Sequence, residues 1–273
     1  MRKKSKKEKC LKSVLLIALA WVVFGTMLGT AFAADAPAKK ITDDLFGYWR
    51  FDEATVDSFS DASGKCPVAT PDNWLKNSIS MVPGKIGSAL AFDGNGNKWG
   101  NTLPVSGKEL SGKIQDFCMA FWIQPVAWNK DKAVDQEPGR WGKNEFIRKG
   151  HSFMVILNKD DNETAGEIQF MIYKPNWHQR SASYKLPLKQ WTFVVWNFTE
   201  KKGGQLYING KAQGGLVGEA DDAIPAGSDA LGIGRNTANV MLDEFAVWGR
   251  TLSEAEISDL YNEGKGKAII PAQ

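Results

Sequence analysis

Five tryptophans of this 273-residue chain lie in polar, loop-like surroundings, where an indole ring can reach a ligand: Trp74, Trp99, Trp128, Trp141 and Trp177. An exposed indole stacks well on the apolar C–H face of a sugar ring, and it also anchors protein–protein interfaces. The alternative is that the loops fold back and bury the rings, which we expect for about half of them.

Hydrogen-bond donors flank two of these rings. Arg140 directly precedes Trp141, and residues 177–180 read Trp-His-Gln-Arg. Donors beside an aromatic ring suit the hydroxyl groups of a carbohydrate. The sequence therefore predicts a ligand-binding site formed by Trp99, Trp128, Arg140, Trp141, Trp177, His178 and Arg180.

The first 33 residues predict an export signal. Residues 2–12 contain seven basic residues and one acid, residues 14–24 are apolar, and Ala31-Phe32-Ala33 is a typical cleavage site. We expect cleavage and a secreted or cell-surface location in a bacterium; an uncleaved membrane anchor is the alternative, because residues 11–33 are long enough to cross a bilayer. Removing the signal leaves 27 basic against 30 acidic residues, so no basic surplus supports nucleic-acid binding.

The rest of the chain is long enough for one large domain. Residues 34–44 predict a linker, residues 45–264 the domain, and residues 265–273 a short tail that we expect to be disordered. Two cysteines follow the signal, Cys66 and Cys118. Export favours a disulfide between them, although a buried free thiol at Cys118 is a comparable alternative.

Alternating and β-branched patterns predict about a dozen short strands. The clearest is 117–123, where every second residue is apolar and Pro125 is expected to end the strand. A capping box, Ser253 to Glu256, begins the one predicted helix, and Gly264 is expected to end it. Many strands with one terminal helix predict an all-β, two-sheet antiparallel sandwich. The further predicted strands are 45–51, 88–92, 145–149, 153–157, 167–173, 191–198, 205–208, 231–235 and 240–248.

Several motifs, in order along the chain, resemble the laminin-G-like members of the concanavalin A-like lectin/glucanase superfamily. They are the segments GYWRFDE at 47–53, DASG at 61–64, GKIGSALAFDG at 84–94, FWIQP at 121–125, LYINGK at 206–211, LGIGR at 231–235, LDEF at 242–245 and RTLS at 250–253. The resemblance implies a concanavalin A-like jelly-roll with glycans or proteins bound on the concave sheet or its rim loops. Residues 126–143 depart from the family by being longer and richer in tryptophan, so we expect specificity there.

The same resemblance implies a structural calcium ion near the first and last strands. Carboxylates in loops are suitable ligands for this hard cation. The predicted ligands are Glu53, Asp61, Asp93 and Asp243, each at a strand end. The alternative is that Asp93 forms a turn with Gly94 and that Asp61 caps loop amides.

The sequence lacks the catalytic patterns known for enzymes of this superfamily. Its glucanases carry E-x-D-x-E or E-x-D-x-x-E on one strand, and its lyases carry R-x-E, Q-x-H and Y-x-K motifs; Asp243 and Glu244 are adjacent, which predicts opposite faces of the sheet. We therefore expect a non-catalytic carbohydrate-binding or adhesion module. A protein-binding module of a surface assembly is the alternative, and a glycan hydrolase or lyase is the third reading.

Overall fold

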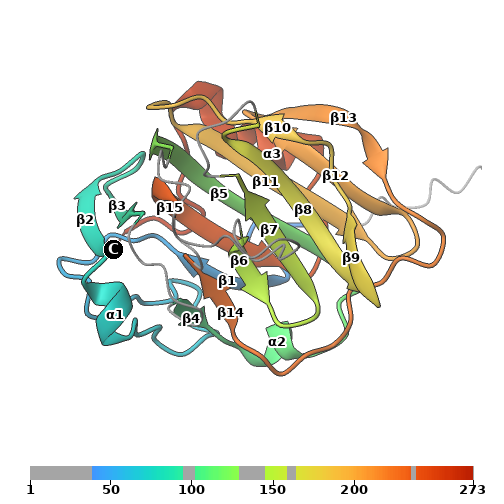
Figure 1. Ribbon diagram of the computed structural model, residues 1–273, viewed down its shortest axis with the longest axis horizontal. Coiled ribbons are helices and arrows are strands. Elements are labelled where there is room, and N and C mark those ends of the chain that lie inside the picture. The colour runs from blue at the N-terminus through green and yellow to red at the C-terminus, as the bar shows by residue number, and fades with distance from the viewer. Residues whose placement is uncertain (1–38, 95–101, 129–144, 159–163, 235–237, 273) are drawn as a thin grey trace, which may run out of the picture. The chain divides into compact units, whose positions relative to one another are not determined.

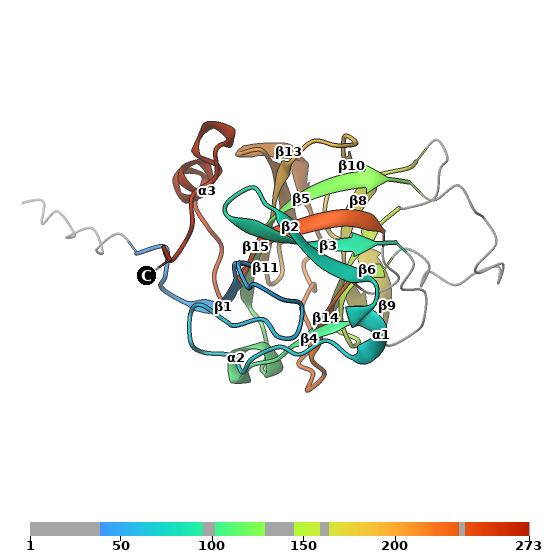
Figure 2. The ribbon, with the colours of Figure 1, turned by 90° about the vertical axis from the view of Figure 1, so that its left-hand side faces the viewer.

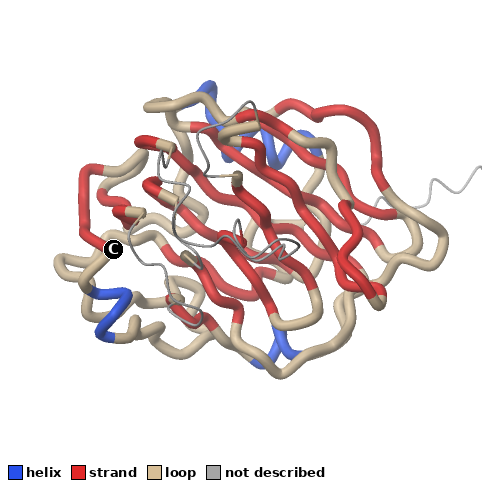
Figure 3. Tube along the Cα trace, in the orientation of Figure 1, coloured by secondary structure: helices blue, strands red, loops and turns tan. Residues whose placement is uncertain are grey.

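The computed structural model describes residues 39–94, 102–128, 145–158, 164–234 and 238–272. The predicted signal, residues 1–33, and most of the predicted loop 126–143 lie outside the described residues. The described chain forms two antiparallel sheets that face each other, which confirms the predicted sandwich (Figure 1). Strands dominate and the helices are short (Figure 3).

The larger sheet contains eight strands in the order β13-β12-β11-β5-β15-β3-β2, with β1 paired to β15. Its longest strands, β5 (Asp116–Ala127) and β15 (Asn239–Trp248), lie side by side at the centre. The other strands are β1 (Leu45–Trp49), β2 (Ile79–Pro83), β3 (Ser88–Asp93), β11 (Thr192–Thr199), β12 (Gly203–Ile208) and β13 (Lys211–Val217).

The smaller sheet contains seven strands in the order β10-β8-β7-β6-β14-β4, with β9 paired to β8. Its central meander, β6 to β8, was predicted from the sequence. The strands are β4 (Leu103–Val105), β6 (Glu145–Lys149), β7 (Phe153–Leu157), β8 (Glu167–Lys174), β9 (Asn176–Gln179), β10 (Tyr184–Lys185) and β14 (Leu231–Ile233). Two short helices, α1 (Asn73–Lys76) and α2 (Lys108–Ser111), lie in connecting segments.

Two apolar clusters explain this layering. The larger lies between the sheets and takes alternate residues from both, such as Phe121 and Trp196 on one side and Phe153 and Phe170 on the other. The smaller lies on the outer face of the eight-stranded sheet, where helix α3 (Glu254–Tyr261) covers it with Ile257 and Leu260. Figure 2 shows α3 on the side of the sandwich remote from β6, β8 and β9. Helix α3 thus covers the outer face of the eight-stranded sheet. The other outer face of the sandwich is that of the seven-stranded sheet.

The capping box at the start of α3 is confirmed. The Ser253 hydroxyl accepts a hydrogen bond from the Glu256 amide, and the Glu256 carboxylate accepts one from the Ser253 amide at 2.8 Å. Asn262, with φ +47°, ends α3 before the predicted Gly264, which also has a positive φ. The predicted helix therefore begins at the expected residue, and its α-helical part ends two residues earlier than expected.

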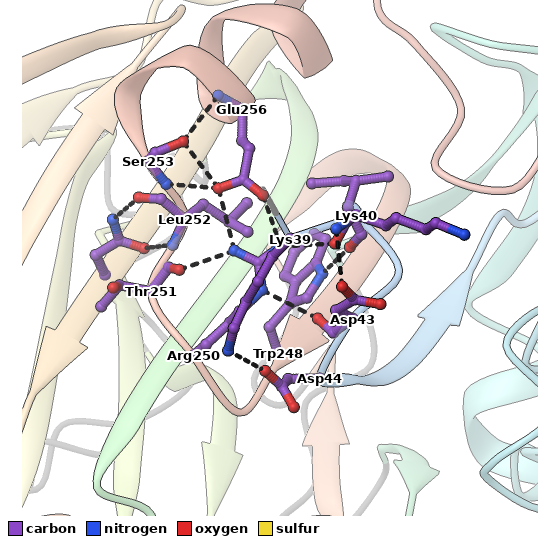
Figure 4. A network of polar contacts seen from close by, with 12 residues as sticks. Lys39, Lys40, Asp43, Asp44, Trp248, Arg250, Thr251, Leu252, Ser253 and Glu256 are labelled. Atoms are coloured by element: carbon purple, nitrogen blue, oxygen red, sulfur yellow. Dashed lines mark hydrogen bonds and ion pairs between the residues drawn. The ribbon is translucent and has the colours of Figure 1, made fainter. Parts of the chain in front are cut away.

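The predicted linker contributes to the domain from Lys39 onward. Arg250 donates to the Asp43 and Lys40 carbonyls and pairs with Glu256 at 2.6 Å, while the Trp248 indole donates to Ile41 (Figure 4). These contacts connect the chain before β1 to the start of α3. The linker prediction for 34–44 is thus wrong for residues 39–44.

The C-terminal tail is also part of the packed structure, so the expectation of disorder is wrong for residues 265–272. Ile269 and Ile270 pack against the cluster beneath α3, and the Ile269 amide donates to the Tyr48 hydroxyl. These two partly buried side chains fix the end of a polar segment, since removing apolar surface from water stabilises by about 25 cal/mol per Å².

Pro125 does not end its strand, contrary to expectation, because β5 continues to Ala127. On one side of β5, pairing with β11 stops at Ile123, while on the other side Pro125 pairs with Val240. A proline can therefore occupy this position, since its missing N–H falls where one neighbouring strand has already ended. No helix in the described segments is both long and apolar enough to span a membrane.

The predicted disulfide is wrong, because Cys66 and Cys118 are both free thiols. Cys118 belongs to the cluster beneath α3, whereas Cys66 packs against the cluster between the sheets, where its thiol donates to the Phe46 carbonyl. The two side chains thus lie in different clusters on opposite faces of the eight-stranded sheet. Burial raises the pKa of the Cys66 thiol to about 12.

Reduction should therefore leave stability unchanged. A disulfide typically contributes about 2–5 kcal/mol. We expect the thermal midpoint to be the same with and without dithiothreitol, measured by circular dichroism. A clear fall in the midpoint on reduction would mean that the two thiols are bridged in the native protein.

Candidate functional site

Three aromatic side chains gather at one end of the seven-stranded sheet. Tyr173 on β8 pairs with Trp177 on β9, and their rings lie 5.4 Å apart in an edge-on arrangement. His151, in the turn between β6 and β7, lies 4.7 Å from Tyr173 and 6.4 Å from Trp177. Ile172 points into the core, so its neighbour Tyr173 points to the outer face. We call Tyr173, Trp177 and His151 the aromatic cluster.

Arg148 on β6 adds a cation to this cluster. Its guanidinium carbon lies 5.1 Å from the centre of the Trp177 ring, which is cation–π geometry. The guanidinium also pairs with the buried Glu145 at 2.7 Å and donates to the Gly150 carbonyl at 2.9 Å. Because protein groups orient Arg148 in this way, the side chain is positioned before any ligand binds.

A pocket of about 320 Å³ adjoins the aromatic cluster and shares Arg148 and His151 with it. Its remaining lining residues come from the start of β4, from the β6–β7 turn and from β14 with the segment before it: Thr102, Gly150, Asp229, Ala230 and Gly232. The pocket therefore offers a guanidinium, a carboxylate and a hydroxyl next to aromatic rings. Such a combination can bind a polar, ring-shaped ligand by stacking and hydrogen bonding.

Of the predicted ligand-binding residues, only Trp177 belongs to this site among those the structure describes. His178 follows Trp177 on β9 and pairs with the inward-facing Ile172, so it lies on the opposite face. Trp128 is half-buried and packs on the core against Gly166. Trp99, Arg140 and Trp141 lie outside the described residues.

Arg180 is a structural residue and not an exposed donor, which corrects its predicted role. Its side chain is 5% exposed and forms two hydrogen bonds with the fully buried Asp222, one of them at 2.6 Å. Its carbonyl accepts the Trp196 indole N–H at 2.8 Å. The buried guanidinium is thus fully engaged in connecting the segment after β9 to the segment that contains Asp222.

Sequence reasoning missed Arg148, Tyr173, His151 and Asp229. The first two could have been found, because strands 145–149 and 167–173 were predicted and alternation places Arg148 and Tyr173 opposite the apolar Ile147 and Ile172. His151 and Asp229 lie in connecting segments whose course the sequence does not reveal.

The four predicted calcium ligands are not brought together. Asp61 uses both carboxylate oxygens as acceptors for backbone amides, that of Tyr48 on β1 and those of its own loop, including Cys66, as the capping alternative expected. Glu53 accepts from the Ser60 amide, and Asp93 pairs with Asn239 at the end of β15 remote from Asp61. In the segments that the structure describes, the one carboxylate trio that could bind a metal is Glu219, Asp221 and Asp222, and these pair with Lys174 and Arg180.

Asp243 differs from the other three and lies beside a second buried acid. Asp243 pairs with Trp122 and Ala246 with Ala120, so β15 has one extra residue here, a β-bulge at Glu244 with φ +54°. Since Trp122 and Ala120 both point to the cluster beneath α3, the bulge places Asp243 and Glu244 on the same face. The expectation that they point to opposite faces is therefore wrong.

These two carboxyl groups are only partly satisfied by the protein. Asp243 Oδ2 accepts the amides of Lys85 and Ile86, and Glu244 Oε2 accepts the Tyr48 hydroxyl. Asp243 Oδ1 and Glu244 Oε1 are buried and have no hydrogen-bond partner. Burial raises the pKa of Asp243 to about 8 and that of Glu244 to about 7. Two unsatisfied carboxylate oxygens on one face match the ligand chemistry of a hard cation.

Comparisons with known proteins agree with the fold. A family model described as the concanavalin A-like lectin/glucanases superfamily matches residues 95–258. No curated protein matches the sequence. Among solved structures, the binding domain of Paraclostridial Mosquitocidal Protein 1 is similar with a TM-score of 0.59 and 17% identity, over 82% of this chain and 53% of that one.

Two further structures were solved with ligands. Domain 4 of AbnA, an extracellular arabinanase from Geobacillus stearothermophilus, in complex with arabinotriose, matches with a TM-score of 0.56 and 18% identity, over 79% of this chain and 97% of that one. The binding domain of Botulinum Neurotoxin DC in complex with SialylT matches with a TM-score of 0.57 and 14% identity, over 82% and 52%. The chain spans about half the length of the toxin domains, and at these identities the likeness concerns the fold alone.

Proposed function

Because this chain belongs to the concanavalin A-like lectin/glucanases superfamily, we propose that it is a non-catalytic module that binds glycans on the outer face of the seven-stranded sheet. The observation that carries the proposal is the aromatic cluster, with Arg148 over Trp177, opening into the pocket beside Asp229. Aromatic faces with adjacent polar groups are suited to sugar rings. Toxin binding domains are among the solved structures with similar folds, and so is domain 4 of AbnA, which was solved in complex with arabinotriose.

A non-catalytic role is supported by where the adjacent acids lie. Asp243 and Glu244 are buried on the α3 side of the eight-stranded sheet, whereas the pocket belongs to the other sheet. Retaining hydrolysis needs two carboxyl groups beside the same glycosidic bond. The basic and apolar segment at residues 1–33 supports export to the cell surface or medium as part of this proposal.

We propose further that a calcium ion stabilises the module at Asp243 and Glu244. Their unsatisfied, buried oxygens are its ligands, and the ion would neutralise two charges that burial otherwise penalises. This site differs from the set predicted from sequence, since it keeps Asp243 and adds Glu244.

The glycan proposal predicts that Trp177→Ala weakens binding by at least about tenfold, because it removes both the stacking surface and the partner of Arg148. Trp177 is half-buried at the edge of its sheet, so the free energy of unfolding should change by less than about 1 kcal/mol. A glycan array followed by isothermal titration calorimetry measures the first quantity, and thermal unfolding measures the second.

Trp74→Ala is the matched control, since Trp74 is 61% exposed on α1, outside the aromatic cluster. Equal loss of binding in both variants would place the ligand elsewhere.

A protein-binding role is the second candidate, since one similar toxin domain was solved with rat synaptotagmin II. An array without a single bound sugar, together with a stable partner in pull-downs, would favour that candidate.

A further inference from the structure

The pocket contains the Asp229 carboxylate, whose position is fixed by close contact with the backbone of Gly150. Asp229 Oδ2 lies where a Cβ on Gly150 would be, 2.0 Å from it, so the carboxylate rests directly on the Gly150 backbone. Gly150 has φ +39°, and any side chain there would push Asp229 out of the pocket. Within the described part of the chain, the Asp229 carboxylate has no hydrogen-bond or ion-pair partner. Its oxygens are therefore available to a ligand.

Lys149 holds the segment that carries Asp229. Its side chain is 1% exposed, and its ammonium donates to the Gly227 carbonyl at 2.6 Å and the Asp229 carbonyl at 2.8 Å. A buried ammonium is costly unless it is hydrogen-bonded, so these two bonds tie the segment 227–229 firmly to β6. Both hydrogen bonds of Lys149 go to backbone carbonyls, and the Asp229 charge acts on its ammonium only electrostatically, so the Asp229 oxygens keep their hydrogen-bonding capacity for the pocket.

The charges that line the pocket are balanced among the described residues. Arg148 supplies one positive charge and Asp229 one negative charge, with the Thr102 hydroxyl beside them. A sugar carboxylate bound here would bring a second negative charge close to Asp229, and like charges at short range cost energy. A neutral sugar avoids this penalty, because its hydroxyl groups can donate to Asp229 and accept from Arg148.

Building on the proposed glycan-binding function, we propose that the pocket selects uncharged sugar residues, with Asp229 as the specificity-determining acceptor and Lys149 as its positioning residue. The Asp229 carboxylate repels the carboxylates of uronic and sialic acids, and it accepts charge-assisted hydrogen bonds from the hydroxyl groups of neutral sugars. Lys149 acts through the backbone that places Asp229.

The experiment compares the full chain with its Asp229→Asn variant on neutral oligosaccharides, including arabinotriose, and on acidic ones, including trigalacturonate and sialyllactose. We expect the best neutral sugar to bind the unmodified protein at least ten times more tightly than the best acidic sugar. In Asp229→Asn the ratio should fall below about three, because the amide keeps the shape but loses the charge. Preferential binding of acidic sugars, or an unchanged ratio in the variant, overturns the selectivity alone. Absence of binding to every sugar overturns the glycan proposal and this one with it.

Lys149→Met tests the positioning role. We expect the same fall in the neutral-to-acidic ratio while circular dichroism shows a folded protein, and no further fall in the double variant Lys149→Met/Asp229→Asn, because both act through one carboxylate. A merely structural lysine would lower stability and leave the ratio unchanged. Effects on the ratio that add in the double variant would likewise contradict the coupling of Lys149 to Asp229.

Discussion

Asp222→Ala is expected to lower the free energy of unfolding by about 3–5 kcal/mol, because it leaves the buried Arg180 guanidinium without its partner. Both side chains are inaccessible, and their contact consists of two parallel hydrogen bonds. The Asp222 carboxylate also accepts the Glu219 amide at 2.8 Å. Removing it deprives three donors of their acceptor, and the remaining acidic neighbour of the guanidinium, Glu219, is 55% exposed and 3.4 Å away.

The effect reaches beyond the pair itself. Arg180 presents its carbonyl to the indole of Trp196, a fully buried residue of the cluster between the sheets. Displacing Arg180 therefore disturbs the core as well as the surface segments. For a domain of this size, each kcal/mol corresponds to about 2–4 °C in the thermal midpoint, so the loss is easily measured by calorimetry.

Asp221→Ala is the matched control for Asp222→Ala. Asp221 belongs to the same acidic group, but its side chain is 74% exposed and pairs with Lys174 at the surface. Exposed ion pairs contribute about 0–1 kcal/mol, so this variant should unfold nearly as the unmodified protein does. Comparable losses in the two variants would show that the Arg180–Asp222 pair is not the stabilising contact. In either case glycan binding to the Asp221 variant should be unaffected, since Asp221 is not among the pocket-lining residues.

The strands were predictable because the core imposes alternation on the sequence. Segments 145–149 and 153–157 match β6 and β7. Every second side chain of β7 enters the cluster between the sheets, and β6 contributes the adjacent Phe146 and Ile147 at a register shift. The edge strands β2, β4, β9, β10 and β13 were missed. β9, β10 and β13 are polar or glycine-rich and β4 has only three residues, so these strands carry little apolar pattern. These segments are strands because they form backbone hydrogen bonds with an adjacent strand, and their own sequences do not indicate it.

The site was only partly predictable, because it depends on strand register. Trp177 was recognised as a candidate ligand-binding residue, but its assignment to a loop concealed that β9 turns His178 to the other face. Arg180, one step beyond the strand, enters a buried ion pair that depends on Asp222, 42 residues away. The β-bulge at Glu244 was equally hidden, since no feature of LDEF indicates that two adjacent acids share a face.

Without calcium, stability should fall as the pH rises from about 4 to about 8. Burial raises the pKa of Asp243 to about 8 and that of Glu244 to about 7, whereas both groups titrate near pH 4 in an unfolded chain. In this interval the folded state retains protons that the unfolded state releases. A raised carboxyl pKa therefore stabilises the fold at low pH, and this contribution is lost as the pH rises through the folded pKa. The slope is about 1.4 kcal/mol per pH unit for each proton.

Calcium should reverse this loss. The ion binds the ionised carboxylates and displaces their protons, so it stabilises most at high pH, by about 2.7 kcal/mol at a concentration one hundred times its Kd. Thermal midpoints measured from pH 5 to pH 8 with EGTA and with excess calcium should diverge steadily as the pH rises. In the double variant Asp243→Asn/Glu244→Gln the two curves should coincide and lose their slope, since neither group titrates.

The pH dependence in EGTA and the stabilisation by calcium can fail separately. A falling curve in EGTA that calcium does not lift would leave the buried acids as proton-binding groups and refute the metal site. A flat curve under both conditions would mean that Asp243 and Glu244 are ionised in the fold without an ion, which their burial and unsatisfied oxygens argue against. Because the bulge at Glu244 creates this pair, restoring regular pairing by deleting Glu244 should abolish the calcium response and leave the pocket on the other sheet able to bind glycans.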